Sequence, residues 1–501
     1  MQPLLPKLEG LRVVPQLGRI DAKSIAQTDQ LILVLPERPK EALLRRIPGG
    51  RKLAAALKKR RAGSLPAALT RADNDRQTLV VVGTIKPGTE AFERLSFARK
   101  LVAAATTEKA GILGIAVQGF ADEAHDELLE ALVAAALAAG TPLPEWKQKA
   151  SPRSIRSVRL LGLDKKPELD RVRAEARGNH LARWLTMLPP NKLDADAYAN
   201  VARAIADDKG WDFQRFDTAR LEELGAGAFL AVAQGNGDDS ASIVRLRYRP
   251  ADDSDDPAVA LVGKGIIFDT GGTNLKPFNS MLDMHGDMQG SAVALGTLLA
   301  LSDLQVPFAI DCWLAITENR TGPTAYKSQD LVTALNGKTI QTIHTDAEGR
   351  MALADTLTMA TREKPGLVID YATLTGSCID AVTTRYAGVF TNRPDWHPRL
   401  KRTGRASGER VWPFPIGGEF LEELESPVAD LMQCTVKGTG DHIYAASFLG
   451  EFIENDTPWL HVDLAAGEHE GGLGHIPTKV TGFGVRLTLA LLLDEKIGET
   501  D

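Results

Sequence analysis

Short runs of apolar and β-branched residues alternate with helix-like segments along most of this chain. In the first third, the strand-like runs cover residues 31–35, 78–82, 110–117 and 157–163. Helical patterns cover residues 90–105 and 122–139. A chain with this alternation buries its strands against helices, which is the arrangement of α/β layer folds. The pattern therefore predicts an α/β protein.

The same alternation continues to the end of the chain. Further strands are expected at residues 242–248, 258–262, 309–317, 367–371 and 460–463, and helices at 291–301, 350–362 and 443–453. A length of 501 residues is too great for one hydrophobic core, so two domains are expected.

A polar stretch at 164–168, followed by a helical pattern at 169–185, marks the connection between the two domains. We expect a non-catalytic N-terminal α/β domain at residues 1–165, which is a candidate for oligomerisation. A connecting helix is expected at 166–185 and a catalytic domain at 186–501, with a mixed, largely parallel sheet flanked by helices.

Composition excludes several classes of protein. A formal net charge of −6 gives no general attraction to nucleic acid or anionic lipid. The three cysteines (Cys312, Cys378 and Cys434) form no CxxC pair, which fits a reducing compartment. The first residues lack the order of a signal peptide, and the longest apolar runs fall short of the ~20 residues of a membrane span. We therefore expect a cytoplasmic protein without a membrane partner.

The first segment that carries candidate catalytic or metal-binding residues lies at residues 261–277. A strand delivers Lys264, and Asp269 follows five residues later on a glycine-rich loop that contains Gly271 and Gly272. Asp287 follows on a second loop. Ligands bind at the carboxyl ends of strands in open α/β sheets, and glycines let the backbone approach a bound group closely.

The second segment carries Asp346 and Glu348, with Arg350 two residues further on. The alternation predicts that both carboxylates lie on one side of an extended backbone, just ahead of a helix. Clustered carboxylates raise one another's pKa values, and divalent cations such as Mg²⁺, Mn²⁺ or Zn²⁺ relieve that repulsion. Two metal ions at one site can polarise a carbonyl and activate a water.

These two segments resemble the signatures of the leucyl aminopeptidase family, the cytosolic M17-type metallopeptidases. The family hallmark reads Asn-Thr-Asp-Ala-Glu-Gly-Arg, and this chain has His344 in place of the Asn. The distances along the chain from Lys264 to Asp269, Lys276 and Asp287 are 5, 12 and 23 residues, as in the family pattern. Further matches lie at 189–191, 372–376 and 428–431. The resemblance covers roughly residues 177–493, and over the first domain it rests on layout.

The resemblance implies a set of metal ligands. Lys264 would bind one ion through a neutral amine, together with Asp287. Asp346 would bind the second ion, and Asp269 and Glu348 would bridge both. The implied cofactors are thus two divalent metal ions per subunit, with manganese or zinc expected and magnesium as a further option.

The resemblance also implies roles around the metals. Lys276 would polarise the scissile carbonyl, and Arg350 would hold a bicarbonate that helps to move a proton to the leaving amine. The substrate side chain would meet Met284, Thr373 and Gly376, and the carbonyl of Leu374 would receive the substrate amide.

The implied activity is release of N-terminal amino acids from short peptides by a homohexameric enzyme. Two other classes stay open: a two-metal phosphoesterase, and a non-catalytic or moonlighting DNA-binding regulator. The second draws on a basic run that contains Arg45, Arg46, Arg51, Lys52, Lys58, Lys59, Arg60 and Arg61. The polar face of an amphipathic helix explains that run more simply, so nucleic acid is not the expected partner.

Three places depart from the family pattern. For His344 we favour a neutral histidine that is hydrogen-bonded to a neighbouring loop, over a pH-sensitive tuner of the metal site. The segments Asp441–Tyr444 and Glu468–Glu470 also differ from the family. Since both segments can reshape the substrate pocket, a preference for leucine is not assumed.

Overall fold

The computed structural model describes residues 4–7, 10–59, 64–108, 111–149, 155–237, 239–250 and 257–498. The chain forms two compact units. The large unit combines Met1–Pro6, Arg177–His469 and Val480–Asp501, and the small unit combines Lys7–Ala176 with Glu470–Lys479. The division falls inside helix α6 (Asp170–Thr186), in the region expected to connect two domains. The roles expected for the two domains stay predictions.

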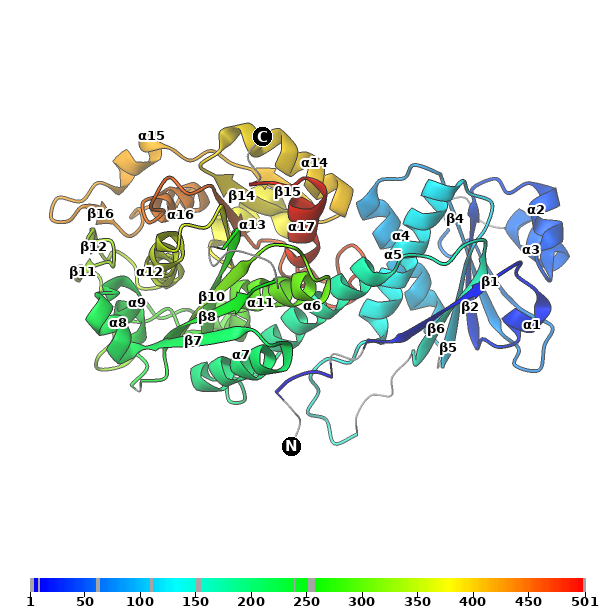
Figure 1. Cartoon of the computed structure of the whole chain (residues 1–501), viewed down its shortest axis with the longest axis horizontal. Helices are drawn as coiled ribbons and strands as arrows, with labels where there is room; N and C mark the ends of the chain where they lie inside the picture. The colour runs from blue at the N-terminus through cyan, green and yellow to red at the C-terminus, as the bar shows by residue number, and fades with distance from the viewer. Residues whose placement is uncertain are drawn as a thin grey trace. The chain divides into compact units, whose positions relative to one another are not determined.

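The small unit is built on a six-stranded sheet (Figure 1). Its strands lie in the order β1 (Arg12–Leu17), β6 (Ser157–Leu163), β5 (Ile112–Val117), β2 (Gln30–Pro36), β4 (Leu79–Ile85) and β3 (Ala68–Arg71). All neighbouring pairs are parallel except β3 with β4. The four strands expected in this part of the chain are present, although Ala110 lies outside the described residues.

Alternation along the central strand β2 explains how this sheet is covered. Ile32 and Val34 belong to a core shared with α4 (Ala91–Ala105) and α5 (Asp122–Gly140). Leu31 and Leu33 belong to a second core, shared with α1 (Ala22–Ile25), α2 (Glu41–Arg46) and α3 (Gly50–Lys58). Successive side chains of a strand point to opposite faces, so one apolar run supplies both cores.

The large unit is built on an eight-stranded sheet (Figure 1). Its order is β15 (Val411–Pro413), β14 (Ala387–Thr391), β17 (Trp459–Asp463), β13 (Leu367–Ala372), β9 (Val259–Asp269), β10 (Ile310–Asn319), β8 (Ser242–Tyr248) and β7 (Asp212–Asp217). The central strands β17, β13, β9 and β10 are parallel, whereas β14, β8 and β7 run antiparallel to their inner neighbours. The predicted mixed, largely parallel sheet is confirmed.

Two helices cover opposite faces of the central strand β9. Gly263 and Gly265 lie against α11 (Gln289–Asp303): a Cβ atom on Gly263 would come within 2.3 Å of the Cα of Ser291. Lys264, between them in sequence, points to the other face, toward α12 (Glu348–Arg362). The two glycines therefore let α11 approach the sheet closely while Lys264 enters the opposite layer.

The remaining elements surround this sheet. The helices are α7 (Ala195–Lys209), α8 (Thr218–Leu224), α9 (Gly227–Ala233), α10 (Phe278–Met281), α13 (Gly376–Val382), α14 (His397–Ser407), α15 (Gly418–Leu421), α16 (Asp441–Gly450) and α17 (Val485–Leu489). A small sheet joins β11 (Leu331–Thr333), β12 (Thr339–Gln341) and β16 (Leu431–Met432). Among the described residues, no helix is both long and apolar enough to cross a membrane.

Two expected boundaries are wrong in ways that matter for the site. The strand expected at 258–262 continues to Asp269, because its pairing with β10 persists to the contact between Asp269 and Asn319. Asp269 is therefore the last residue of a strand and not part of a loop. The helix expected from residue 350 begins at Glu348, so Glu348 and Arg350 both lie in its first turn.

Candidate active site

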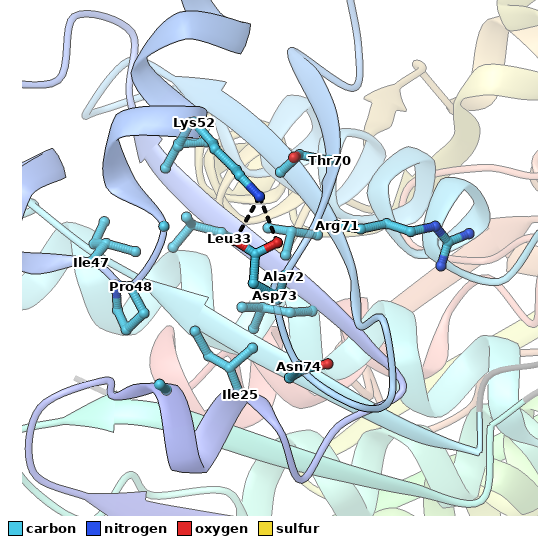
Figure 2. Close-up of a pocket in the computed structure, with 15 residues that line it drawn as sticks. Ile25, Leu33, Ile47, Pro48, Lys52, Thr70, Arg71, Ala72, Asp73 and Asn74 are labelled. Carbon is cyan, nitrogen blue, oxygen red and sulfur yellow. Dashed lines mark hydrogen bonds and ion pairs between the residues drawn. The ribbon is translucent and has the colours of Figure 1, made fainter.

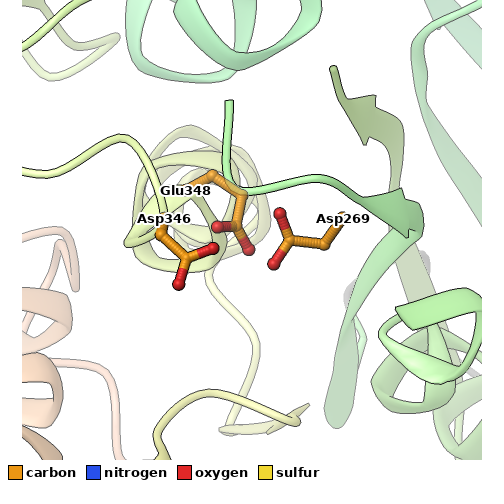
Figure 3. A group of neighbouring side chains, drawn as sticks. All are labelled: Asp269, Asp346 and Glu348. Carbon is orange, nitrogen blue, oxygen red and sulfur yellow. The ribbon is translucent and has the colours of Figure 1, made fainter. Parts of the chain in front are cut away.

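The sequence-predicted metal ligands meet where β9 ends and α12 begins. Asp269, Asp346 and Glu348 each offer a carboxylate oxygen, and these oxygens all lie within 4.8 Å of one another (Figure 3). Asp269 and Glu348 are buried, and Asp346 is partly buried. The strand end and the helix start thus bring together carboxylates that are far apart in the sequence.

Lys264 links this cluster to the fourth carboxylate, Asp287. Its Nζ lies 2.9 Å from Asp287 Oδ2 and 2.9 Å from Glu348 Oε1, and it donates a hydrogen bond to the Thr373 carbonyl at 3.0 Å. Burial alone would lower the pKa of Lys264, but the charges of Asp287, Glu348 and Asp269 outweigh it and raise the pKa above its ordinary value. In the metal-free protein this lysine is an ammonium.

Lys276 forms a second bridge on the other side of the cluster. Its Nζ lies 2.9 Å from Asp269 Oδ2 and 2.6 Å from Asp346 Oδ1. Burial again opposes its charge, but the pKa is raised overall because Asp269, Glu348 and Asp346 face it. Each lysine therefore contacts two carboxylates, and the two bridges together hold all four.

Burial is the main cause of the pKa shifts of the carboxylates. It raises the pKa of Asp287, Asp346 and Glu348, and the neighbouring charge of Asp269 raises each further. Mutual repulsion, the cause expected from the sequence, thus comes second to the loss of water.

The glycine-rich turn after β9 holds the backbone close to these carboxylates. Gly271 and Gly272 have φ angles of +86° and +64°, which favour glycine. A Cβ atom on Gly271 would lie 2.8 Å from Asp346 Oδ1. Thr345 ties the two segments together, since its hydroxyl donates to the Gly271 carbonyl at 2.6 Å. The glycines were expected to let the backbone approach a bound group closely. In the structure the group that lies against Gly271 is the Asp346 carboxylate.

The backbone around Asp346 is not extended, contrary to the sequence-based expectation. Asp346 lies in a turn, and Glu348 is the first residue of α12. The carboxylates converge because buried Gln433 binds this turn at two places. Its Oε1 accepts from the N–H groups of Ile343 and His344, both at 3.1 Å, and its Nε2 donates to the Ala347 carbonyl at 3.0 Å.

Asn319 is a second residue that sequence reasoning missed. Its Nδ2 donates to Asp269 Oδ1 at 2.8 Å, to the Thr345 carbonyl at 3.0 Å and to Glu348 Oε2 at 3.2 Å. Asn319 ends β10 directly beside Asp269, so the rule that sites form at the carboxyl ends of strands points to it. No comparable signal exists for Gln433, which comes from a distant segment.

His344 hydrogen-bonds within its own turn. Its Nδ1 accepts the N–H of Asp346 at 3.2 Å. An asparagine at this position can offer its side-chain oxygen to the same N–H group. The expected hydrogen bond is present, but its partner lies in the same turn and not in a neighbouring loop, and the neutral state of the ring stays a prediction.

The expected substrate residues lie in two places. Thr373, Leu374 and Gly376 follow β13, and Met284 precedes Asp287. Thr373 Oγ1 donates to Asp287 Oδ1 at 2.7 Å, so this side chain contacts a candidate metal ligand. Asp463 holds the next turn, because its Oδ1 accepts from Leu374 N at 3.2 Å and its Oδ2 from Thr375 Oγ1 at 2.7 Å.

The other two expected substrate residues lie at helix starts. Gly376 opens α13, and a Cβ atom there would meet no atom within 4 Å among the described residues. Met284 begins the short helix η1 (Met284–Gly286), three residues before Asp287. Met284 is thus close to Asp287 along the chain, and Gly376 lies three residues after Thr373.

Arg350 is buried in α12 and paired within the protein. Its Nη2 donates to Asp441 Oδ2 at 2.6 Å, and its Nη1 donates to the Gln433 carbonyl at 3.1 Å. Burial would lower its pKa, but the facing Asp441 carboxylate raises it overall. The guanidinium that was expected to bind bicarbonate is therefore hydrogen-bonded to a carboxylate of this chain.

The residues present fit divalent metal ions. Asp287 Oδ2 and Asp346 Oδ1 are buried, and each faces a lysine ammonium, at 2.9 and 2.6 Å respectively. Carboxylate oxygens that are gathered in one buried place are suitable ligands for hard cations. Four carboxylates against two ammonium groups leave two formal negative charges at the site, which favours bound cations.

A cavity of about 190 Å³ lies in the small unit (Figure 2). Apolar side chains such as Ile25, Leu33 and Ile47 line it, and Lys52 pairs with Asp73 at 2.5 Å beside it. On α3, which carries part of the basic run, Leu53 is buried and Lys58 is exposed, as in an amphipathic helix. Arg60 and Arg61 lie outside the described residues. Among the described residues that line this cavity, Asp73 is the one carboxylate, so they form no cluster like that at the end of β9.

Buried carboxylates and lysines at the carboxyl edge of a largely parallel α/β sheet define a candidate metal-dependent hydrolase. Residues 180–489 match the cytosol aminopeptidase family, catalytic domain. A probable cytosol aminopeptidase of Stutzerimonas stutzeri is 40% identical over 340 residues, covering 65% of this chain and 68% of that protein. One of Roseiflexus castenholzii is 37% identical over 408 residues, covering 78% and 83%.

Solved structures agree with these relatives. A mutant of tomato leucine aminopeptidase superposes with a TM-score of 0.83 at 25% identity, covering 97% of this chain and 96% of that one. The bottromycin maturation enzyme BotP in complex with Mn gives 0.79 at 29% identity, covering 94% and 100%. The chain belongs to the cytosol aminopeptidase family, which contains the leucyl aminopeptidases. This membership makes it a peptidase of a metal-dependent family.

Gly349 yields a first prediction, because a Cβ atom there would lie 2.6 Å from Cε and 2.7 Å from Nζ of Lys264. Gly349→Ala should push the Lys264 amine out of the cluster with little change in melting temperature, since only a flexible side chain has to move. We expect Mn²⁺ affinity, measured by calorimetry, to fall by at least about ten-fold. Gly418→Ala, in open space on α15, is the matched control. Unchanged affinity in Gly349→Ala would contradict this account.

His344 yields a second prediction. His344→Asn keeps an acceptor for the Asp346 N–H, so activity should stay within about two-fold and the pH–rate profile should not move. His344→Ala removes the acceptor and should lower kcat/KM about five-fold. A profile that shifts in His344→Asn would favour the pH-sensitive tuner instead.

Proposed function

We propose that this protein is a dinuclear metal-dependent aminopeptidase that releases N-terminal amino acids from short peptides. One observation carries the proposal: two lysines interlock four carboxylates in a single buried cluster. Lys264 contacts Asp287 and Glu348, and Lys276 contacts Asp269 and Asp346. A cluster of this kind is costly to bury without further positive charge, and it combines a candidate amine ligand with hard oxygen donors.

The proposed ligands are Lys264, Asp269, Asp287, Asp346 and Glu348. Two divalent ions held there would supply Lewis acidity, which would polarise the scissile carbonyl and activate a water. Asn319 and Gln433 orient the ligands, because they hydrogen-bond Asp269, Glu348 and the turn around Asp346. The relative solved with Mn supports manganese, with zinc and magnesium as further candidates.

The chain's own groups would bind and orient the peptide. Lys276 would donate to the carbonyl oxygen as that oxygen gains negative charge. Asp463 fixes the N–H of Leu374 and the hydroxyl of Thr375, which sets the turn whose Leu374 carbonyl would accept the substrate amide. Met284, Thr373 and Gly376 would contact the N-terminal side chain, and the open space at Gly376 leaves room for it.

Specificity for chain ends follows from the same geometry. A free α-amine is present only on the first residue of a peptide, and in neutral form it can ligate a metal ion. We further propose a cytoplasmic homohexamer that admits short peptides. The family resemblance supports this assembly, and the name of the relatives, cytosol aminopeptidase, supports the location.

The raised pKa of Lys264 predicts that metal binding releases protons. An amine ligates only after it loses its proton, and the carboxylates whose pKa values are raised also favour protons at low pH. Mn²⁺ affinity should therefore rise with pH, by about ten-fold per pH unit for each proton released. Calorimetry in buffers of different ionisation enthalpy counts those protons. An affinity that stays constant across the neutral range would show that Lys264 keeps its proton.

The function itself is tested with a panel of aminoacyl-p-nitroanilides. The Mn²⁺-loaded chain should cleave them, a chelator should abolish cleavage, and Mn²⁺ should restore it. N-acetyl-leucine p-nitroanilide should resist, because it lacks a free amine. Asp346→Ala should lower the rate by at least about a hundred-fold, whereas Glu419→Ala, an exposed acidic residue on α15, should not.

Two outcomes would replace this proposal. Hydrolysis of p-nitrophenyl phosphate, with every nitroanilide left intact, would favour a phosphoesterase. Salt-dependent DNA binding that survives in Asp346→Ala, in a protein without peptidase activity, would favour a regulator.

A further inference from the structure

Arg350 offers an anion site at the edge of the carboxylate cluster. It lies two residues after Glu348 on α12, and only 1% of its side chain is exposed. A buried guanidinium needs an anionic or strongly polar partner for its forked N–H groups. The family resemblance assigns this place to a free bicarbonate.

In this chain the place is already filled. Asp441 Oδ2 accepts from Arg350 Nη2 at 2.6 Å, and the Gln433 carbonyl accepts from Nη1 at 3.1 Å. Both terminal nitrogens of the guanidinium are therefore engaged by the protein. A second anion would set two negative charges against one positive charge beside a guanidinium that is only 1% exposed, which is unfavourable.

The local sequence explains how Asp441 reaches Arg350. Gly440 has a φ of +73°, and this left-handed residue turns the chain so that α16 begins at Asp441. At the first position of a ten-residue helix, the carboxylate also gains from the positive end of the helix dipole. The expected helix at 443–453 thus begins two residues earlier, inside the segment that departs from the family pattern.

Asp441 also resembles a bound anion because one of its two carboxylate oxygens has no hydrogen-bond partner. Its Oδ1 is buried and makes no hydrogen bond. A carboxylate and a bicarbonate share the same planar pair of oxygens, one for the arginine and one that is free to accept a proton or a hydrogen bond. The side chain thus offers the chemistry of the free ion, on a covalent tether.

We propose that Asp441 is the built-in occupant of the Arg350 anion site, so that bicarbonate neither binds to this protein nor stimulates it. The claim that bicarbonate does not stimulate the protein rests on the proposed aminopeptidase function. The claim that bicarbonate does not bind is independent of it, because it concerns only which anion contacts the guanidinium.

Binding is tested with the full chain loaded with Mn²⁺, in buffer stripped of carbon dioxide. ¹³C-labelled bicarbonate is titrated by calorimetry and NMR, with sodium chloride at matched ionic strength as the reference. Asp441→Ala vacates the guanidinium and should bind bicarbonate at least about ten-fold more tightly than the unchanged chain. Asp441→Asn removes the charge but has nearly the same size, so it should bind bicarbonate less tightly than Asp441→Ala.

Kinetics supply the second readout. The unchanged chain should hydrolyse aminoacyl-p-nitroanilides at one rate with or without bicarbonate. Asp441→Ala should lose about ten-fold in kcat, and bicarbonate or formate should restore most of that loss. Glu451→Gln, at the other end of α16, should stay indifferent to bicarbonate.

Three results would overturn the inference. One is unchanged protein that binds bicarbonate as tightly as Asp441→Ala. The second is unchanged protein that loses activity when carbon dioxide is removed. The third is folded Asp441→Ala, with an unaltered melting temperature, that binds no anion. If no variant cleaves a peptide substrate but the difference in bicarbonate binding persists, the aminopeptidase proposal fails and the assignment of the anion site stands.

Discussion

The contact of the Lys264 ammonium with Asp287 and Glu348 is the constraint on which the rest of the large unit depends. Four carboxylates cannot share a buried volume unless positive charge enters with them. Lys264 reaches them from the middle of a central strand, so the charge lies at the core of the unit and not on a mobile loop. The strand must therefore carry a long polar side chain on one face and stay tightly packed on the other.

Glycines resolve that conflict on both sides of the lysine. Gly263 and Gly265 let α11 pack closely against one face of β9, and Gly349 leaves room for the Lys264 side chain beside α12. Three positions around this one lysine must therefore be glycine, because a side chain there would collide with its neighbours. In the hallmark Asp-Ala-Glu-Gly-Arg, the glycine follows from this packing, while the acidic residues and the arginine follow from charge.

The sequence predicts much of this arrangement because two of its signals are local. Apolar alternation is decided within single segments, so the strands of both sheets appear near their expected places. The acidic residues follow strand ends or precede a helix, and the carboxyl edge of a sheet gathers them. What the sequence does not reveal depends on partners from distant segments. Gln433 bends the turn at Asp346, and pairing with β10 extends β9 to Asp269. Asp441 meets Arg350 from 91 residues away.

The pairing of Arg350 with Asp441 places a carboxylate of a distant segment against the arginine of the hallmark Asp-Ala-Glu-Gly-Arg. A free anion loses translational freedom when it binds, whereas a tethered carboxylate is present at high effective concentration regardless of the solution. The arginine therefore stays neutralised at any level of dissolved carbon dioxide. The tether also fixes the anion's position to that of α16, and the same helix packs against α12 and α13. Movement of α16 would then move the anion relative to Glu348, which couples the charge balance of the site to the packing of one helix.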